Sequence, residues 1–91
     1  MQTNYPYQNT NLLASEVDDE LILHSGAMEV LHVLNPTARL VWDLCDAQHS
    51  PEDIAESMRS RFSMPQDYDV LADVIETLRV FSERGLLQKP E

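Results

Sequence analysis

The stretch VLHVLNPTARLVWDLC, residues 30–45, changes its periodicity at its centre. Its beginning is almost entirely apolar, as in a strand, whereas the apolar residues after Thr37 recur at helical spacing. Asn35 and Pro36 stand at the joint, where Asn is a preferred N-cap and Pro at the first helical position loses no hydrogen bond. A strand that runs directly into a buried helix forces sheet and helix to share one core. The stretch therefore predicts a strand-to-helix corner on which the fold depends.

Two strands are predicted before this corner, over residues 12–17 and 20–24, and a turn at Ser25-Gly26 leads into the third strand, residues 28–34. Neither face of the third strand is polar, so it is either central in its sheet or has a face and an edge that a partner covers. Alternation places Met28, Val30, His32 and Leu34 on one face, and Glu29, Leu31 and Val33 on the other.

The first two predicted helices both begin with proline. The first runs from Pro36 to residue 45 or 46, and the second begins at Pro51 and ends near Phe62. Ser50, followed by Asp53, resembles a weak capping box at the start of the second helix.

A third helix is predicted from about residue 65 or 67 to Arg84, with Gly85 as its stop signal. After it, residues 86–87 are expected to fold back as a short strand. The apolar stripe expected to face the core consists of Leu71, Val74, Ile75, Leu78 and Phe81.

This order predicts an α+β domain of the winged helix-turn-helix-like type over residues 12–88: a small N-terminal antiparallel three-stranded sheet followed by three helices. Residues 1–11 are polar, and we expect them to form a disordered or loosely attached tail.

The charge of the chain argues against several classes of partner. Its net charge of −10 repels phosphate backbones and anionic membranes. In a helix-turn-helix protein the later helix enters the major groove, but here the first half of that helix carries acids and no Lys or Arg. We therefore expect no nucleic-acid partner. The acids are Asp67, Asp69, Asp73 and Glu76.

Neither a membrane segment nor a catalytic centre is expected. No apolar run approaches the roughly 18 residues of a membrane span, and the N-terminus does not read as a secretory signal. The lone Cys45 suits a reducing cytoplasm and falls at a helix end, where the dipole disfavours a thiolate. His24, His32 and His49 lack metal-ligand spacing. The sequence thus favours a cytoplasmic, non-enzymatic protein without a cofactor or metal.

Peptide binding remains, because a small sheet with an open edge can accept an extended chain as an added strand. The strand at residues 28–34 is a plausible acceptor, and the third helix is a plausible wall of the groove. One face of that helix is expected to lie beside the main core stripe, and it carries Val70, Asp73, Val74 and Thr77. The alternative is that the chain's own helices and tail cover both faces of the strand.

The ordered set LNPTARLVWDLCD (34–46), SPEDIAESM (50–58) and DVIETLRVFSERGLL (73–87) resembles the PqqD-like family. These RiPP recognition elements are peptide chaperones for ribosomally synthesised and post-translationally modified peptides. The resemblance covers roughly residues 20–87, and its most specific piece is Leu34-Asn35-Pro36-Thr37-Ala38 with Trp42 and Leu44.

The resemblance implies that the third strand and third helix hold the leader region of a precursor peptide as an added antiparallel strand. It also implies delivery to a modifying enzyme, either a radical SAM enzyme in pyrroloquinoline quinone formation or a leader peptidase and cyclase in lasso peptide pathways. The alternative is a structural, regulatory or dimerisation module without leader binding, and a homodimer is possible. The implied peptide-binding residues are Met28, Glu29, Val30, Leu31, His32, Val33, Val70, Asp73, Val74, Thr77 and Phe81.

Overall fold

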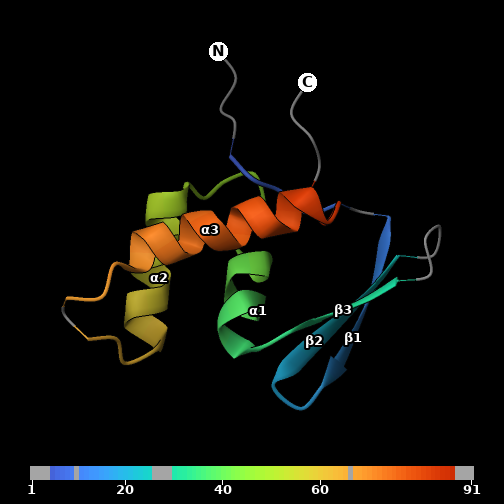
Figure 1. The fold of residues 1–91 in the computed structure, drawn as a ribbon, viewed down its shortest axis with the longest axis horizontal. Coiled ribbons are helices and arrows are strands. Elements are labelled where there is room, and N and C mark those ends of the chain that lie inside the picture. Colours follow the sequence, from blue (N-terminus) through green and yellow to red (C-terminus); the bar gives the residue numbers. More distant parts are fainter. Residues whose placement is uncertain (1–4, 10, 26–29, 66, 88–91) are drawn as a thin grey trace.

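The computed structural model describes residues 5–9, 11–25, 30–65 and 67–87. Three strands lead into three helices (Figure 1), which confirms the predicted α+β order. The elements are β1 (Leu12–Val17), β2 (Glu20–Ser25), β3 (Val30–Leu34), α1 (Pro36–Asp43), α2 (Pro51–Arg61) and α3 (Val70–Glu83).

The sheet is antiparallel with the order β1-β2-β3, so β3 is an edge strand. Across the β2–β3 pair, Leu21 lies opposite Leu34 and Leu23 lies opposite His32. The three leucines are buried, so this face of the sheet points into the core. No segment that the structure describes pairs with the second edge of β3.

Side-chain caps hold the starts of the first two helices as the sequence predicts. The Asn35 side chain accepts a hydrogen bond from the backbone N–H of Ala38 at 2.9 Å, directly before Pro36. At α2, the Asp53 N–H donates to Ser50 Oγ and the Ser50 N–H donates to the Asp53 carboxylate, both at 3.1 Å. This reciprocal pair satisfies two backbone donors that the helix leaves without partners.

The start of α3 lies later than predicted. The Asp69 side chain accepts from the Ala72 N–H at 3.0 Å, so the helix begins at Val70 instead of residue 65 or 67. At its other end Gly85 has φ +75°, the left-handed conformation expected of a glycine stop signal.

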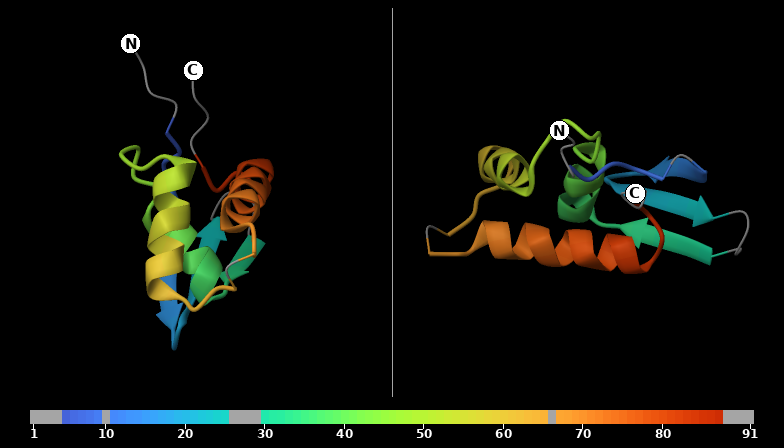
Figure 2. Two further views of the ribbon diagram at one scale, coloured as in Figure 1. Left: turned by 90° about the vertical axis from the view of Figure 1, so that its left-hand side faces the viewer. Right: turned by 90° about the horizontal axis from the view of Figure 1, so that it is seen from above.

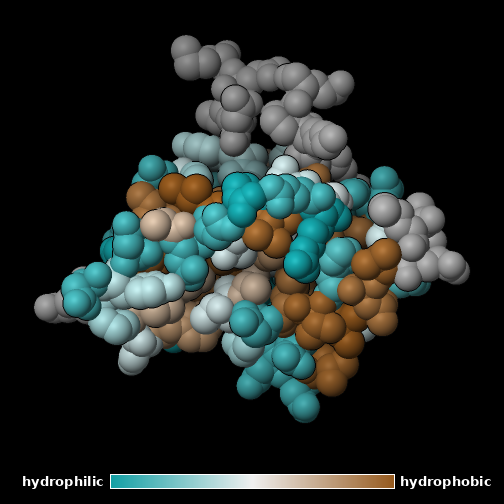
Figure 3. All heavy atoms as spheres, in the orientation of Figure 1, coloured by the Kyte–Doolittle hydropathy of each residue, from teal (hydrophilic) through white to brown (hydrophobic). Residues whose placement is uncertain are grey.

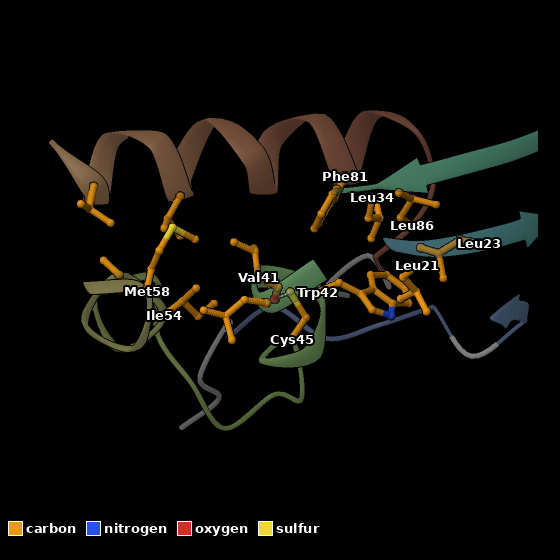
Figure 4. Close-up of a cluster of buried hydrophobic side chains, with 14 residues drawn as sticks. Leu21, Leu23, Leu34, Val41, Trp42, Cys45, Ile54, Met58, Phe81 and Leu86 are labelled. Atoms are coloured by element: carbon orange, nitrogen blue, oxygen red, sulfur yellow. Dashed lines mark hydrogen bonds between the residues drawn. The ribbon is translucent and has the colours of Figure 1, made fainter. Parts of the chain in front are cut away.

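Of the three helices, α1 packs against β2 and β3. It stands between α2 and the strands, and α3 runs along one side of α2 and α1 toward the strands (Figure 2). Figure 4 shows Phe81 extending from α3 toward Leu34 and Trp42. The core is completed by residues from every helix and from the C-terminal segment, among them Val41, Cys45, Ile54, Met58, Val70, Val74 and Leu86.

The buried stripe of α3 differs from the prediction at two positions. Val70 is fully buried, whereas Ile75 is 51% exposed. Val70, Val74 and Phe81 form the line that packs against α2, α1 and the end of β3, so Val70 and Val74 belong to the core and not to an offset face. Helical spacing alone could not decide this, because the sequence has apolar residues at both margins of the stripe.

Part of the stretch expected to be a loose tail is hydrogen-bonded to the domain. The N–H of Gln8 donates to the Cys45 carbonyl and the N–H of Asn9 to the Leu86 carbonyl, each at 2.9 Å. The Gln8 side-chain amide also donates to the Trp42 carbonyl at 2.9 Å. Residues 5–9 therefore connect the loop after α1 with the C-terminal segment, where Leu87 forms the expected short strand contact.

Candidate functional site

The free edge of β3 carries exposed apolar side chains. Leu31 and Val33 are 63% and 59% exposed and point away from the helices, and Val30 is 40% exposed on the opposite face. His32 is half-buried on the helix side. Soluble proteins usually protect an edge strand with charges, proline or a covering element. Within the described residues β3 has none of these protections, so its edge is available to another strand.

A groove separates this edge from α3. No Cα atom of α3 lies within 8 Å of a Cα atom of β3. At one end the space forms a pocket of about 310 Å³, lined by Ser25, Val30, His32, Glu83, Arg84 and Gly85. Figure 3 shows apolar surface gathered over the strands below this region.

The C-terminal end of α3 borders the groove. Asp73, Thr77, Val80 and Arg84 recur at helical spacing on one side of the helix, and Arg84 lines the pocket together with Val30. The Thr77 hydroxyl donates to the Asp73 carbonyl at 2.9 Å, which ties that side chain to its own helix. Asp73, Thr77 and Val80 are half-buried.

The predicted site residues fall into three groups. Val30, Leu31, His32 and Val33 lie on the edge strand, and Asp73 and Thr77 lie half-buried on α3, outside the lining of the pocket. Val70, Val74 and Phe81 are buried in the core, so they hold α3 from behind and offer no surface to a ligand in the groove. Met28 and Glu29 lie outside the described residues.

Sequence reasoning missed four residues that line the pocket. They are Ser25 at the end of β2 and Glu83, Arg84 and Gly85 at the end of α3. Arg84 continues the line of Asp73 and Thr77 at helical spacing, so extending that line to the end of the helix would have found it.

Charges on α3 are partly neutralised within the helix. Arg79 forms ion pairs with Glu76 and Glu83, and its hydrogen bond lowers the pKa of Glu76. The carboxylate of Asp73 raises the pKa of Tyr68 near the start of the helix. Arg84 forms no ion pair with a residue that the structure describes, so a positive charge stands at the pocket end of the groove.

The outer face of the sheet also carries several exposed apolar side chains, beside Ser15, Glu20 and His24. It displays Leu13, Val17, Leu31 and Val33, all exposed, with Ile22 half-buried between β1 and β3. A contiguous exposed apolar surface is uncommon on a soluble monomer and marks a surface that contacts a partner.

Cys45 has no nucleophilic character. Its side chain is buried, and its Sγ donates to the Val41 carbonyl at 3.1 Å. Burial, together with the nearby carboxylates of Asp46 and Asp43, raises the pKa of the thiol to about 12. This confirms the prediction of a structural cysteine. Across residues 5–9, 11–25, 30–65 and 67–87, no helix has the length and apolarity to cross a membrane.

A family comparison decides where this chain belongs. The model of the family described as "Coenzyme PQQ synthesis protein D (PqqD)" matches residues 20–87, which include all three helices. The chain belongs to the PqqD family. The family resemblance inferred from LNPTA and the two later helices is therefore confirmed. The comparison with curated protein sequences found no match to this PqqD family member.

Two solved structures share the fold of this PqqD family member. One is described as "TbiB1 in Complex with the TbiA(beta) Leader Peptide", with 20% identity, a TM-score of 0.78, and coverage of 93% of this chain and 98% of that one. The other is described as "Lasso peptide synthetase B1 complexed with the leader peptide", with 21% identity, a TM-score of 0.79, and coverage of 93% and 99%. At these identities the likeness establishes a common fold.

Proposed function

We propose that this protein captures the leader region of a ribosomally synthesised precursor peptide by strand addition and presents it to a modifying enzyme. The observation that carries the proposal is the uncovered edge of β3, which lies beside the groove under α3. In this role the chain binds and positions its guest and performs no chemistry itself. Membership of the PqqD family and the leader peptides named with both similar structures support the assignment.

Strand addition supplies affinity through the backbone. Every second residue of an edge strand directs its N–H and C=O away from the sheet, and an antiparallel guest pairs with them. β3 runs directly into α1 through the Asn35 cap, and its other edge is paired with β2. The binding edge is thus ordered before the guest arrives, which lowers the entropic cost of association.

Side chains on the two faces of the guest would meet different surroundings. On one face they enter the groove beside Val30 and His32, next to Glu83 and Arg84 at the end of α3. On the other face they lie next to Leu31 and Val33 and extend the apolar outer surface. Selectivity therefore arises in the groove, whereas the outer face of the added strand stays accessible.

The outer face of the sheet is the surface we assign to the modifying enzyme. A guest in the groove leaves Leu13, Val17, Leu31 and Val33 uncovered and adds its own outward side chains to them. An enzyme that contacts this surface touches protein and guest together, and it therefore binds the loaded module more tightly than the empty one.

A titration tests the binding step. The probe is a fluorescein-labelled leader peptide, made from the short reading frame encoded next to this gene. Saturable binding below about 100 μM, in the range expected for a transient peptide complex, supports the proposal. If no saturable binding appears, the proposal is wrong.

Two proline variants show whether the guest pairs with β3. Successive backbone N–H groups of a strand point to opposite sides of it. One of the two variants Leu31→Pro and His32→Pro therefore removes an N–H that points away from β2. The other removes an N–H that bonds to β2. The outward variant should keep the circular dichroism spectrum of the parent and lose affinity. Unchanged affinity in a folded outward variant would exclude strand addition.

Self-association through the same edge is the competing use of β3. Light scattering on the free protein, with and without the leader, distinguishes the two. A monomer that stays a monomer with the peptide bound agrees with the proposal. A dimer that the leader cannot dissociate would favour a dimerisation module instead.

A further inference from the structure

We infer that Asn9 is a positioning residue for the guest. It holds the end of α3 at a fixed distance from the sheet, and it thereby sets the shape of the pocket that receives the C-terminal end of the bound peptide. This inference rests on the proposed function, and it gives the segment that leads into β1 a part in guest recognition.

The pocket at the end of the groove has two walls from different parts of the chain. Ser25, Val30 and His32 come from the sheet, and residues 83–85 come from the end of α3. Val30 is the first residue of β3, so an antiparallel guest reaches the pocket with its C-terminal end. The distance between the two walls decides which guest side chain fits between them.

α3 and the sheet have no close backbone contact. No Cα atom of α3 lies within 8 Å of a Cα atom of β1, β2 or β3. At the Leu34 end of β3 the core joins them, because Phe81 points toward Leu34 (Figure 4). At the Val30 end, where the pocket lies, the segment before β1 supplies a second connection.

Asn9 is the residue that makes this connection. Its side-chain Nδ2 donates to the Gly85 carbonyl at 3.0 Å, and its backbone N–H donates to the Leu86 carbonyl at 2.9 Å. Three residues later the chain enters β1 at Leu12, which lies opposite Ser25 of the pocket. Because three extended residues reach at most about 10 Å, this segment limits how far the end of α3 can move from the sheet.

The asparagine amide is used at both of its ends. Its Oδ1 accepts from the Asn11 N–H at 3.0 Å, so one side chain links the approach to β1 with the end of α3. Gly85 has no side chain and has φ +75°, so backbone hydrogen bonds determine its position. Its N–H donates to the Ser82 carbonyl at 3.2 Å within the helix end, and the bond from Asn9 ties its carbonyl to a different part of the chain.

The neighbouring Gln8 is a natural control. Its side-chain amide donates to the Trp42 carbonyl at 2.9 Å, and Trp42 does not line the pocket. Loss of the Gln8 side chain should therefore lower the stability of the domain and leave the pocket unchanged. Loss of the Asn9 side chain should change the pocket, although its hydrogen bond to Gly85 is exposed and contributes less to stability.

Titration of full-length variants with the fluorescein-labelled leader peptide tests the role of Asn9. Asn9→Ala should raise the Kd about threefold, an effect of the size expected when one hydrogen bond is lost. Gln8→Ala should bind like the parent, although urea denaturation should show it to be the less stable of the two variants. Asn9→Asp keeps the acceptor for Asn11 and loses the donor to Gly85, so it should bind as weakly as Asn9→Ala. This weakening should persist in about 0.5 M NaCl, which screens the effect of an added exposed charge.

An alanine scan of the leader separates positioning from a general loss of stability. The leader residue that fills the pocket is identified by its NMR contacts with Val30 and His32. Its truncation to alanine should weaken binding less in Asn9→Ala than in the parent, because the altered pocket no longer fits that side chain closely. Truncation of leader residues on the outer face should have the same effect on both proteins.

The outcomes separate this inference from the proposed function. If Asn9→Ala binds the leader as tightly as the parent, or if Gln8→Ala loses as much affinity as Asn9→Ala, Asn9 does not position the pocket and leader capture still stands. Equal truncation effects at the pocket residue in the parent and in Asn9→Ala would lead to the same conclusion. If the parent shows no saturable binding, the proposed function is wrong and this inference falls with it.

Discussion

Trp42 of α1 and Phe81 of α3 meet edge to face, with ring centroids 6.1 Å apart and ring planes inclined by 82°. This contact packs α1 against α3 inside the core. Offset and edge-to-face aromatic pairs stabilise beyond the area that they bury. Phe81 also points toward Leu34 at the end of β3, so the core behind the groove joins α3 to the strand (Figure 4).

Removing the Phe81 ring should destabilise the domain strongly. Phe81→Ala should lower the free energy of unfolding by about 3–5 kcal/mol in urea denaturation, because it leaves a cavity between α1 and α3. Phe81→Leu should cost less than Phe81→Ala, because it leaves a smaller cavity, although it also loses the aromatic contact with Trp42. Ile75→Ala on the same helix is the control, since Ile75 is largely exposed and should cost much less. Equal losses at Phe81 and Ile75 would contradict the observed orientation of α3.

The two side chains of the α2 capping box, Ser50 and Asp53, should stabilise the protein cooperatively. Ser50→Ala should lower the unfolding free energy by about 1 kcal/mol, because the Asp53 N–H loses its acceptor. Asp53→Ala removes the reciprocal bond, so the double variant should lose less than the two single losses combined. Ser60→Ala, at an exposed position inside α2, should be neutral or slightly stabilising. Full additivity of Ser50→Ala and Asp53→Ala would show that the reciprocal pair does not act together.

Gln8 should stabilise the domain although it precedes the first strand. Gln8→Ala removes the hydrogen bond to the Trp42 carbonyl and should cost about 1 kcal/mol. The matched control is Gln48→Ala, whose side chain is exposed. A Gln8→Ala variant as stable as the parent would mean that residues 5–9 contribute nothing to the fold in solution.

The thiol of Cys45 should react only when the protein unfolds. Iodoacetamide labelling at pH 8, followed by mass spectrometry, should be slow in buffer and should accelerate across the urea transition. An exposed reference thiol, Ser60→Cys, should be labelled at once under both conditions. Rapid labelling of Cys45 in buffer would contradict its burial.

Alkaline pH tests the same residue through stability. The pKa of Cys45 is about 12 in the folded protein, against 9.0 for an unperturbed thiol. Because the pKa is higher in the folded protein, the protonated Cys45 thiol contributes to the free energy of unfolding. That contribution is complete below pH 9 and is lost as the pH rises toward 12. Cys45→Ala should lack this part of the alkaline loss, so its stability should fall less steeply over that range. Parallel curves for the parent and Cys45→Ala would contradict the raised pKa.

Local patterns were sufficient to predict most of the fold. The Asn35-Pro36 joint, the Ser50 cap and the Gly85 stop each depend on backbone chemistry within a few residues, and the structure has all three as predicted. Strand alternation also correctly separated Leu31 and Val33 from His32 and Leu34.

The misplaced features depend on contacts between distant segments. Val70 is buried and Ile75 is exposed because α2 lies on one particular side of α3, which the spacing within α3 cannot specify. Gln8 and Asn9 are polar and look like a tail, yet their partners are carbonyls about 35 and 75 residues away along the chain. Arg84 was missed as a pocket residue because the spacing within α3 does not show which side of the helix faces β3.

The most direct measurement is amide hydrogen exchange of β3 by NMR, with and without the leader peptide encoded beside the gene. Strand addition predicts that the N–H groups of β3 that point away from β2 exchange rapidly in the free protein and become protected in the complex. The N–H groups that bond to β2 should change little, and the helical amides of α2 should serve as an internal reference. Binding that leaves every β3 amide unchanged would contradict strand addition at this edge.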